Sequence, residues 1–348
     1  MVRAMQYRPL FERSQSWRAE YTSLHSELLA RILQDSHRLR WRILTDSFRV
    51  PLEAYSAHWD KRQEDAIVER AAEFDVVCIV KSPSLPLCRR LRRLSRPRVL
   101  MDINDGLWLP AFRSGEWRDL DAMLSEVNGV ICENEYIARY VRKFNQNVFI
   151  VPDAPQVEVF DKFRGKVPTN PQQLTIGWLG GSENVGPLYR ILEPLEALFA
   201  RYAQLHLRIL GAGESTIPRF EKVRWSCRAK FDQEEMVREV LAFDIGLFPL
   251  FHNEDGCARG TLKAMIYMSG EAVAVCEDYG ENPKLIQDGF NGVLASSPEA
   301  WYEKLEWLIT HPEQRSVIGR RGLETIRERF TAERVFPKLV AAYERILG

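Results

Sequence analysis

A short run of basic and small residues in the second half of the chain has the composition and spacing of an anion-binding site. It has the sequence RGTLK over 259–263 and stands where a polar loop gives way to a helical pattern. Arg259 precedes the expected helix and Lys263 lies in its first turn, while Gly260 and Thr261 supply backbone N–H groups. Because the first free N–H groups of a helix and its positive dipole end attract anions, the run predicts a diphosphate site.

The segments around this run predict a unit of strand, loop, helix and strand. DIGLFPL (244–250) and AVAVC (272–276) are apolar enough to be buried parallel strands, and the apolar residues of LKAMIYM mark a buried helix between them. In such a unit the loop lies at the carboxyl edge of the sheet, where ligands bind. His252 is interpreted as a residue of this loop rather than a catalyst. Alternatively, Gly260 is a turn glycine and the basic side chains are ordinary surface charges.

Composition places the chain among globular proteins of two domains. Its 348 residues exceed one ordinary core, and 48 Lys and Arg balance 48 Asp and Glu, which argues against a general nucleic-acid binder. No apolar run approaches the roughly 18 residues of a membrane span, and the N-terminus lacks the apolar core of a signal peptide. A cytoplasmic protein is therefore expected. The six cysteines form no CxxC pair and are interpreted as reduced core residues, so no metal is expected.

The first half of the chain alternates predicted helices and strands. Helical spacing over 17–34 and 60–73 and a weak strand candidate at 41–45 come first. Clear strands are predicted at 74–80, 98–101, 129–133 and 147–152, with helices at 85–95, 115–127 and 135–144. This alternation is typical of a doubly wound parallel sheet.

Two features of the first half could contact ligands. Asp102 and Asp105 follow a strand and present carboxylates at its carboxyl end, although they could instead bond to N–H groups of a local turn. A basic helix near 85–95 carries Arg89, Arg90, Arg92 and Arg93, with Arg96 after it. Such a face is usually solvated, but it could also rest on an anionic membrane surface.

The second half follows a linker-like segment over 155–173. Its first strand, at 174–179, ends at Gly180 and Gly181, and a strand at 206–211 ends in another glycine turn. A strand is also predicted near 223–226, and helices are predicted at 187–203, 232–242, 298–310, 312–328 and 331–347. Strands and helices alternate here as they do in the first half.

The order of these segments resembles the retaining family 4 glycosyltransferases of the GT-B fold, in a bacterial branch, over nearly the whole chain. The resemblance is carried by IGWLGG, DIGLFPL, GTLKAMIYMSGEAVAV and ENPKLIQDGFNGVLA in the second half, and by VLMDINDGLW and VICENEYIARYVRKFNQNVFIVP in the first. It implies an α/β protein of two Rossmann-like doubly wound parallel-sheet domains facing a cleft. Residues 1–165 would form the acceptor side, 166–330 the nucleotide-sugar side, and 331–348 a helix crossing back to the first domain.

The resemblance also implies an activity and a donor site. Members transfer a sugar from a nucleotide diphosphate sugar to an acceptor, with retention and without a metal or cofactor. Lys263, Arg259 and the backbone at Gly260-Thr261 would then hold the departing diphosphate, because positive charge lowers the barrier where negative charge develops. Gly180 and Gly181 would approach the donor closely.

Four further residues are assigned to the site. Asp102 stands where the family often has a histidine near the reacting carbon, and either it or Asp105 could orient an acceptor hydroxyl or accept its proton. Glu281 and Asn282 could contact sugar hydroxyls, or else cap a helix expected from Pro283.

The chain departs from the family pattern at two places. The usual pair of glutamates eight positions apart is absent: one register puts Ala258 and Ile266 there, and the other puts Asp255 and Lys263. In addition, GGSENVG replaces the basic pair that usually follows the second domain's first strand. Fewer positive charges are therefore left to hold the phosphates.

We therefore predict a cytoplasmic, retaining hexosyltransferase of polysaccharide biosynthesis, acting on a saccharide or lipid-linked acceptor. It would need no nucleic acid and could contact a membrane peripherally. Two alternatives stay open. One is a sugar-nucleotide epimerase or hydrolase of the same fold, and the other is a non-catalytic sugar-nucleotide-binding partner of another transferase, which the missing glutamates favour.

Overall fold

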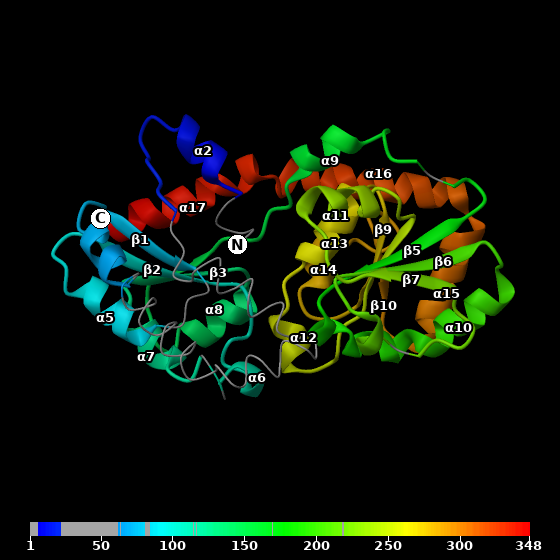
Figure 1. The fold of residues 1–348 in the computed structure, drawn as a ribbon, viewed down its shortest axis with the longest axis horizontal. Coiled ribbons are helices and arrows are strands. Elements are labelled where there is room, and N and C mark those ends of the chain that lie inside the picture. The colour runs from blue at the N-terminus through cyan, green and yellow to red at the C-terminus, as the bar shows by residue number, and fades with distance from the viewer. Residues whose placement is uncertain are drawn as a thin grey trace, which may run out of the picture.

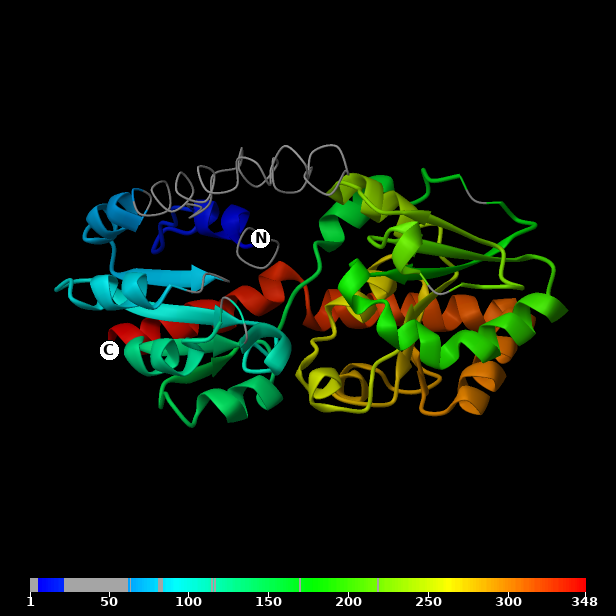
Figure 2. The ribbon, with the colours of Figure 1, turned by 60° about the horizontal axis from the view of Figure 1, so that its bottom comes forward.

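The computed structural model describes residues 6–21, 62, 64–80, 84–113, 115, 117–168, 170–217 and 219–348. These residues form two lobes that lie side by side and are joined by two chain connections (Figures 1 and 2). The helix predicted over 17–34, the strand candidate at 41–45 and the start of the helix at 60–73 lie wholly or largely outside them. Within the described ranges, no helix is long and apolar enough to cross a membrane.

The N-terminal lobe is built on a four-stranded parallel sheet whose strands lie side by side in chain order. The strands are β1 (Val76–Val80), β2 (Arg98–Ile103), β3 (Gly129–Cys132) and β4 (Val148–Ile150). The helices between them are α5 (Leu85–Arg92), α6 (Pro110–Arg113), α7 (Leu120–Glu126) and α8 (Glu135–Val141). Right-handed crossovers between strands in chain order put the main helices on one face, where Met101 and Val130 pack against Leu91 and Leu124.

The opposite face of this sheet is covered by the two ends of the chain. Helix α17 (Ala332–Leu347) packs Leu339 in the same core cluster as Leu100 of the sheet, and α2 (Arg8–Arg13) adds Phe11 to that cluster. The last helix therefore crosses back from the other lobe and completes the core of this one (Figure 1).

The C-terminal lobe has a six-stranded parallel sheet with the order β10-β9-β8-β5-β6-β7. Its strands are β5 (Leu174–Leu179), β6 (Leu205–Leu210), β7 (Trp225–Arg228), β8 (Ile245–Phe248), β9 (Val273–Glu277) and β10 (Val293–Ala295). The chain runs outward from β5 to β7, returns to β8, and runs outward to β10 on the other side. The predicted doubly wound sheet is confirmed here. Strands β5 and β8 form its topological switch point, where open α/β sheets bind ligands.

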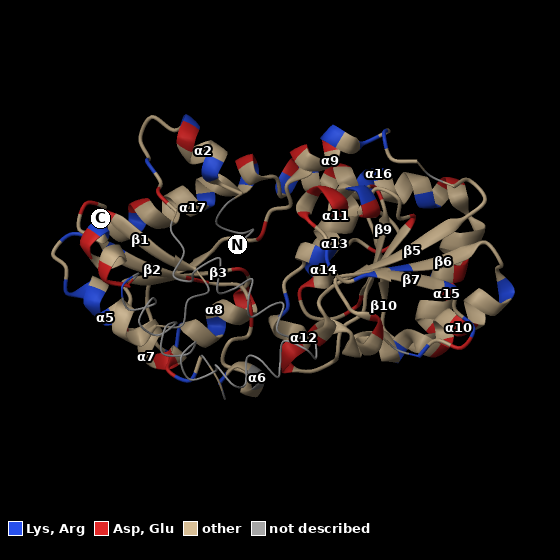
Figure 3. Ribbon diagram, in the orientation of Figure 1, with Lys and Arg blue, Asp and Glu red and all other residues tan. Residues whose placement is uncertain are grey.

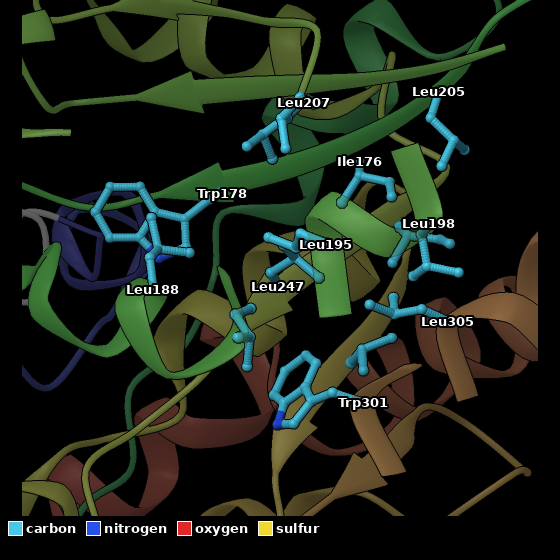
Figure 4. Close-up of a cluster of buried hydrophobic side chains, with 14 of the residues drawn as sticks. Ile176, Trp178, Leu188, Leu195, Leu198, Leu205, Leu207, Leu247, Trp301 and Leu305 are labelled. Carbon is cyan, nitrogen blue, oxygen red and sulfur yellow. The ribbon is translucent and has the colours of Figure 1, made fainter. Parts of the chain in front are cut away.

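Helices cover both faces of the larger sheet. One face carries α10 (Leu192–Arg201) and α15 (Pro298–Thr310), whose Leu195 and Trp301 are fully buried (Figure 4). The other face carries α9 (Val157–Phe163), α11 (Gln233–Val240), α13 (Leu262–Ser269) and α16 (Pro312–Arg329). Phe160 of α9 lies in the core of this face, whereas Val151 and Ala154 lie in the core of the N-terminal lobe.

The structure corrects three predicted elements. The strand predicted to end at Met101 continues through Ile103, because β1 and β3 pair with it on both sides, so Asp102 lies inside the sheet. The loop predicted over 252–259 contains a short helix, α12 (Glu254–Ala258). The helix predicted over 187–203 is divided into a 3-10 segment, η2 (Gly186–Ile191), and α10.

Helix α16 approaches the turn between α13 and β9 closely at Gly319. A Cβ on Gly319 would lie 2.1 Å from the backbone oxygen of Glu271, whereas a Cβ on Gly213 would have no neighbouring atom within 4 Å. Backbone atoms in a packed interior cannot move aside as the end of a flexible side chain can. Glycine at 319 therefore sets the distance between α16 and the sheet.

We expect Gly319→Ala to lower the free energy of unfolding by about 2 kcal/mol, because the strain outweighs the better helix propensity of alanine. Gly213→Ala is the matched control and should change that free energy by less than about 0.5 kcal/mol. Urea denaturation followed by circular dichroism measures both. Equal values for the two variants would contradict the close packing of α16.

Candidate functional site

Lys263 lies at the switch point of the C-terminal sheet, in the first turn of α13. Its Nζ is 5.4 Å from the ring of Trp178 at the end of β5 and 5.6 Å from the ring of Phe248 at the end of β8. A Cβ on Gly180 would lie 3.0 Å from the same nitrogen and 2.6 Å from the Trp178 ring. The predicted site residues Lys263 and Gly180 are therefore together, where a doubly wound sheet binds ligands.

The side chain of Lys263 is partly buried, and its ammonium has no direct partner. It forms no hydrogen bond or ion pair with any residue that the structure describes. Burial, and then the charge of Arg259, lower the pKa of Lys263 to about 8, against the opposing effect of Glu183, Asp105 and Asp255. A partly buried cation without a paired anion is less stable than one in water, so an anionic ligand would stabilise this site.

Arg259 lies near Lys263, but its own charge is already paired. Its Nη2 is 2.9 Å from Oδ1 of Asp255, four residues earlier in α12. The charge of Asp255 also raises the pKa of Lys263, so this one carboxylate interacts with two cations. Arg259 therefore contributes less free positive charge to an anion site than its position in the sequence predicts.

The carboxylates predicted at the end of β2 point to different places. Asp105 is close enough to Lys263 to raise its pKa, although the two belong to different lobes. Asp102 is buried and lies on the same face of the sheet as Leu100, which is the face that α17 covers. Burial is the main cause of the raised pKa of Tyr343 in α17, and the charge of Asp102 raises this pKa further. The structure groups Asp105 with Lys263 and leaves Asp102 on the far face of the sheet.

Gly260 and Thr261 begin α13 directly against the N-terminal lobe. A Cβ on Gly260 would lie 1.7 Å from Oε1 of Glu133, which follows β3 in that lobe, so only glycine permits the contact. Glu133 is not among the predicted site residues. Its place immediately after the apolar strand GVIC is the signal that could have found it, because ligands bind at the carboxyl ends of parallel strands and Asp105 likewise stands just beyond β2.

Beside this contact lies a pocket of about 150 Å³, which we call the crossing pocket. It is formed by both lobes and by both chain connections, and its lining includes Glu133, Asn134, Pro152, Thr261, Arg329 and Phe330. Glu281 also lines it, and its carboxylate is 2.7 Å from Nζ of Lys284. Of the residues predicted to meet the donor, Gly260, Thr261 and Glu281 therefore face this pocket.

Asn282, predicted to contact a sugar hydroxyl or to cap a helix, has a different place. It is only 1% exposed, and its Nδ2 donates to the backbone oxygen of Glu277 at 3.0 Å. Asn282 is itself the first residue of α14 (Asn282–Leu285), which has no side-chain cap. The side chain fixes the end of β9 and is not open to a ligand.

A second charged cluster lies at the end of β9. Glu277 is fully buried, and its Oε1 is 3.0 Å from Nη1 of Arg190 and 2.8 Å from Nε2 of His252. The His252 ring also stacks on Tyr279, with centroids 4.5 Å apart. Glu277 and Arg190 are not among the predicted site residues, although Glu277 directly follows the apolar run AVAVC.

The glycine turns after β5 and β6 pack against each other. Gly211 has a positive φ of 93°, and a Cβ on it would lie 2.5 Å from the backbone oxygen of Gly180. Gly181 precedes a 3-10 turn, η1 (Ser182–Asn184), and a Cβ on it would lie 2.4 Å from the Glu183 carboxylate. The Glu183 carboxylate therefore lies close to the backbone that follows β5. In the part of the chain that is described, no three His, Cys, Asp or Glu side chains gather as metal ligands would.

The lobes touch each other at α12. Nε1 of Trp108 donates to Oε1 of Glu254 at 2.9 Å, and the Trp108 ring stacks on Tyr140 with centroids 4.3 Å apart. A Cβ on Gly106 would lie 2.8 Å from Cβ of Ala258. Figure 3 shows acidic residues on α12 at this meeting point. The space around Lys263 is thus bounded on one side by direct contact between the lobes.

Comparisons with known proteins agree with this architecture. Residues 189–341 match the family model described as glycosyl transferase-like. Among solved structures, the chain is similar to sucrose-phosphate synthase from Thermosynechococcus elongatus, with 13% identity and a TM-score of 0.61 over 82% of this chain and 78% of that chain.

It is also similar to Anabaena HepE in complex with UDP-glucose, with 14% identity and a TM-score of 0.60 over 82% and 80% of the two chains. A glycosyltransferase from Rickettsia africae gives 13% identity and a TM-score of 0.58 over 82% and 80%. By sequence, the chain matches no curated protein. The predicted GT-B fold is confirmed, and the matched segment of the second half is glycosyltransferase-like.

We expect Lys263→Met to raise the free energy of unfolding, because it removes a partly buried charge that has no ion-pair partner among the described residues. Folding lowers the pKa of Lys263 from 10.5 to about 8, so the cost of burying the charge is fully present below pH 8 and disappears as pH rises toward 10.5. The advantage of the variant should therefore be full at about pH 7 and small at about pH 10. Urea denaturation across this range measures it. An advantage that does not vary with pH would contradict a charged Lys263.

Proposed function

We propose that the protein is a glycosyltransferase that binds the diphosphate of a nucleotide sugar at Lys263. The observation that carries the proposal is the partly buried ammonium of Lys263, without an ion-pair partner among the described residues, at the switch point of a GT-B fold beside Gly180. A diphosphate would supply the missing negative charge and would accept hydrogen bonds from the first N–H groups of α13. The glycosyl transferase-like match over 189–341 includes this helix.

In the proposed reaction the bond between the anomeric carbon of a hexose and the diphosphate oxygen breaks, and the anomeric carbon forms a bond to the oxygen of the acceptor hydroxyl. Lys263 and the start of α13 would stabilise the charge that develops on the diphosphate oxygen. Asp105 would orient the acceptor hydroxyl or accept its proton, and its electrostatic effect on Lys263 supports its presence near the reacting groups. We propose retention of configuration and no metal, following the family that the sequence resembles.

The proposed acceptor is a saccharide or lipid-linked saccharide of bacterial polysaccharide biosynthesis, used in the cytoplasm. Contact with a membrane through α5 gains little support from its side chains. Arg90 lies 2.6 Å from Asp65, and the nearby Arg96 lies 3.0 Å from Asp75. These pairs leave few uncompensated positive charges for anionic lipids, so a saccharide acceptor is the better supported choice.

A second candidate function is a non-catalytic sugar-nucleotide-binding partner of another transferase. Lys263 interacts electrostatically with three carboxylates, those of Glu183, Asp105 and Asp255, but with one other cation, Arg259. This excess of negative charge opposes the stabilisation of a departing diphosphate. Tight nucleotide binding without turnover would support this candidate. Consumption of the donor without an acceptor would instead indicate an epimerase or hydrolase.

The proposal is tested first by thermal-shift and calorimetric measurements with UDP, GDP, dTDP, ADP, CMP and their sugar conjugates. A ligand that binds only the folded state raises its stability by mass action. One nucleotide that stabilises the protein would identify the donor class for assays with saccharide acceptors. If none of them raises the melting temperature, the donor site at Lys263 is wrong.

We expect Lys263→Ala to remove the stabilisation by nucleotide and to reduce transfer at least about 100-fold, by analogy with the loss of one oxyanion donor. Lys222, exposed in the same lobe, provides the control, and Lys222→Ala should behave as the wild type. Steady-state kinetics and calorimetry measure both effects. Wild-type activity in Lys263→Ala would remove this residue from the mechanism.

We also expect nucleotide diphosphates to bind the wild type less tightly as pH rises through about 8. Lys263 then loses its proton, and its attraction for the ligand disappears. In Lys263→Arg the charge persists at this pH, so its affinity should change little. Calorimetric titrations from about pH 6.5 to 9 compare the two proteins. Parallel pH profiles would show that another group controls binding.

A further inference from the structure

The hydroxyl group of Tyr267 lies between β5 and β8, at the point where their hydrogen-bonded ladder ends. Both strands are fully described, and their pairing consists of Ile176 with Ile245 and Gly177 with Gly246. In that register the next hydrogen bond would run from the backbone N–H of Leu179 to the backbone oxygen of Leu247. Instead, the Leu179 N–H donates to the Tyr267 hydroxyl at 2.8 Å, and this hydroxyl donates to the Leu247 oxygen at 3.1 Å.

Two hydrogen bonds in series therefore replace one direct hydrogen bond between the strands. A direct bond would bring the Leu179 nitrogen and the Leu247 oxygen to about 2.9 Å, and a hydroxyl oxygen between them requires a larger separation. Burial raises the pKa of Tyr267, so the hydroxyl keeps its proton and can donate and accept at once. The hydroxyl thus holds the carboxyl ends of β5 and β8 apart and still gives both backbone groups a partner.

The last paired residues of the two strands are glycines, and they allow the Tyr267 ring to lie against the sheet. A Cβ on Gly246 would lie 2.2 Å from Cγ of Tyr267. A Cβ on its partner Gly177 would lie 2.0 Å from the ring of Phe243, whose centre is 6.3 Å from that of Tyr267. A larger residue at position 246 would push the Tyr267 ring away from β8. Glycine there therefore lets the hydroxyl reach the space between the strands.

The strand ends that this hydroxyl separates are also those that surround Lys263. Trp178 and Phe248 are the direct chain neighbours of the two backbone groups that bond to Tyr267, and the Lys263 ammonium lies near the rings of both. Lys263 and Tyr267 are four residues apart in α13, so their side chains leave the same side of the helix one turn apart. One helix therefore places the hydroxyl between the strands and the ammonium at the opening above it.

We propose that Tyr267 is a positioning residue of the anion site, whose hydroxyl holds β5 and β8 apart and thereby sets the place of the Lys263 ammonium between them. This inference rests on the proposed binding of a diphosphate at Lys263. Tyr267 is fully buried and both of its hydrogen bonds go to backbone groups, so it does not touch the ligand itself. Without the hydroxyl, the two backbone groups pair directly, because buried backbone groups nearly always have a partner. The opening then closes and displaces the ammonium toward solvent.

The first test compares the pKa of Lys263 in the wild type and in Tyr267→Phe. The full chain is labelled with 13C at the lysine Cε and titrated by NMR, and the Lys263 signal is the one that Lys263→Met lacks. We expect the pKa to rise in Tyr267→Phe from about 8 toward 10.5, because a displaced ammonium is better hydrated. The charged groups that act on this pKa, Arg259, Glu183, Asp105 and Asp255, are all retained. An unchanged pKa in the folded variant would overturn the proposal.

Phe243→Leu is the control for lost packing, because Phe243 belongs to the same core cluster as Tyr267. It should lower the melting temperature, as the removal of buried atoms does, and leave the pKa of Lys263 as in the wild type, because the hydroxyl stays in place. An equal rise of this pKa in both variants would show that any loss of packing moves the ammonium, and would overturn the role of the hydroxyl.

The wild type decides the matter if Tyr267→Phe does not fold. We expect a nuclear Overhauser effect between the hydroxyl proton of Tyr267 and the amide proton of Leu179, since the two groups share a hydrogen bond. The absence of this effect would overturn the proposal.

Nucleotide binding separates this inference from the proposed function. Calorimetric titrations with UDP, GDP, dTDP and ADP compare the wild type with Tyr267→Phe. We expect the variant to bind about tenfold more weakly, which corresponds to the loss of one hydrogen bond from a charged group. If the wild type binds and the variant binds equally well, the role of Tyr267 is wrong and the diphosphate site stands. If the wild type binds none of them, the proposed function fails, while the pKa comparison still tests Tyr267.

Discussion

The order of strands in the C-terminal sheet determines where the chemistry of this protein can occur. Strands β5 and β8 are neighbours, and the connections that follow them leave in opposite directions, which leaves a space at their carboxyl edge. Trp178 and Phe248 form the walls of that space, and the first turn of α13 brings Lys263 between them. The partial burial that lowers the pKa of the ammonium also strengthens its attraction for an anion, because water screens the charge less than at an open surface. The order of the strands therefore produces both the anion site and the free-energy cost of placing the Lys263 charge in it.

The N-terminal lobe depends on the other lobe for its own stability. Its four strands follow chain order, so their connecting helices cover only one face of the sheet. The bare face is covered by α17, which the chain reaches only after the whole C-terminal lobe. The sheet therefore has a complete core only when α17 is in place. The sequence reveals the amphipathic helix near 331–347, but it does not by itself show which face needs covering.

The elements of the C-terminal lobe could be predicted from the sequence because each is a long or strongly apolar pattern. The strand predicted at 174–179 is β5, and the helix predicted at 298–310 is α15. The direction of single polar side chains could not be predicted in this way. Asp102 looks like a turn residue until its pairing in β2 is known, and that pairing turns it toward α17.

Glu133 and Asn134 illustrate the same limit between the lobes. Their sequence indicates a helix cap and nothing more, and the cap is indeed present. The contact between Glu133 and Gly260 depends on how the two lobes meet, which no local sequence pattern records. The same holds for Glu277, whose partners Arg190 and His252 come from distant parts of the chain. Strand ends are where a sequence should be searched, but only the assembled fold shows which of them share a site.

The two connections between the lobes lie together, and α12 lies on the opposite side of the molecule (Figure 1). Helix α12 carries Glu254, which accepts the hydrogen bond from Trp108. The two connections can therefore act as a hinge, and the contact between Trp108 and Glu254 joins the lobes on the side opposite the hinge. A rotation about the connections would move Trp108 through a long arc and the residues around Pro152 and Phe330 through a short one. A small opening would separate the indole of Trp108 from Glu254. The fluorescence of Trp108 would therefore report a rotation that scarcely moves the residues near the two connections.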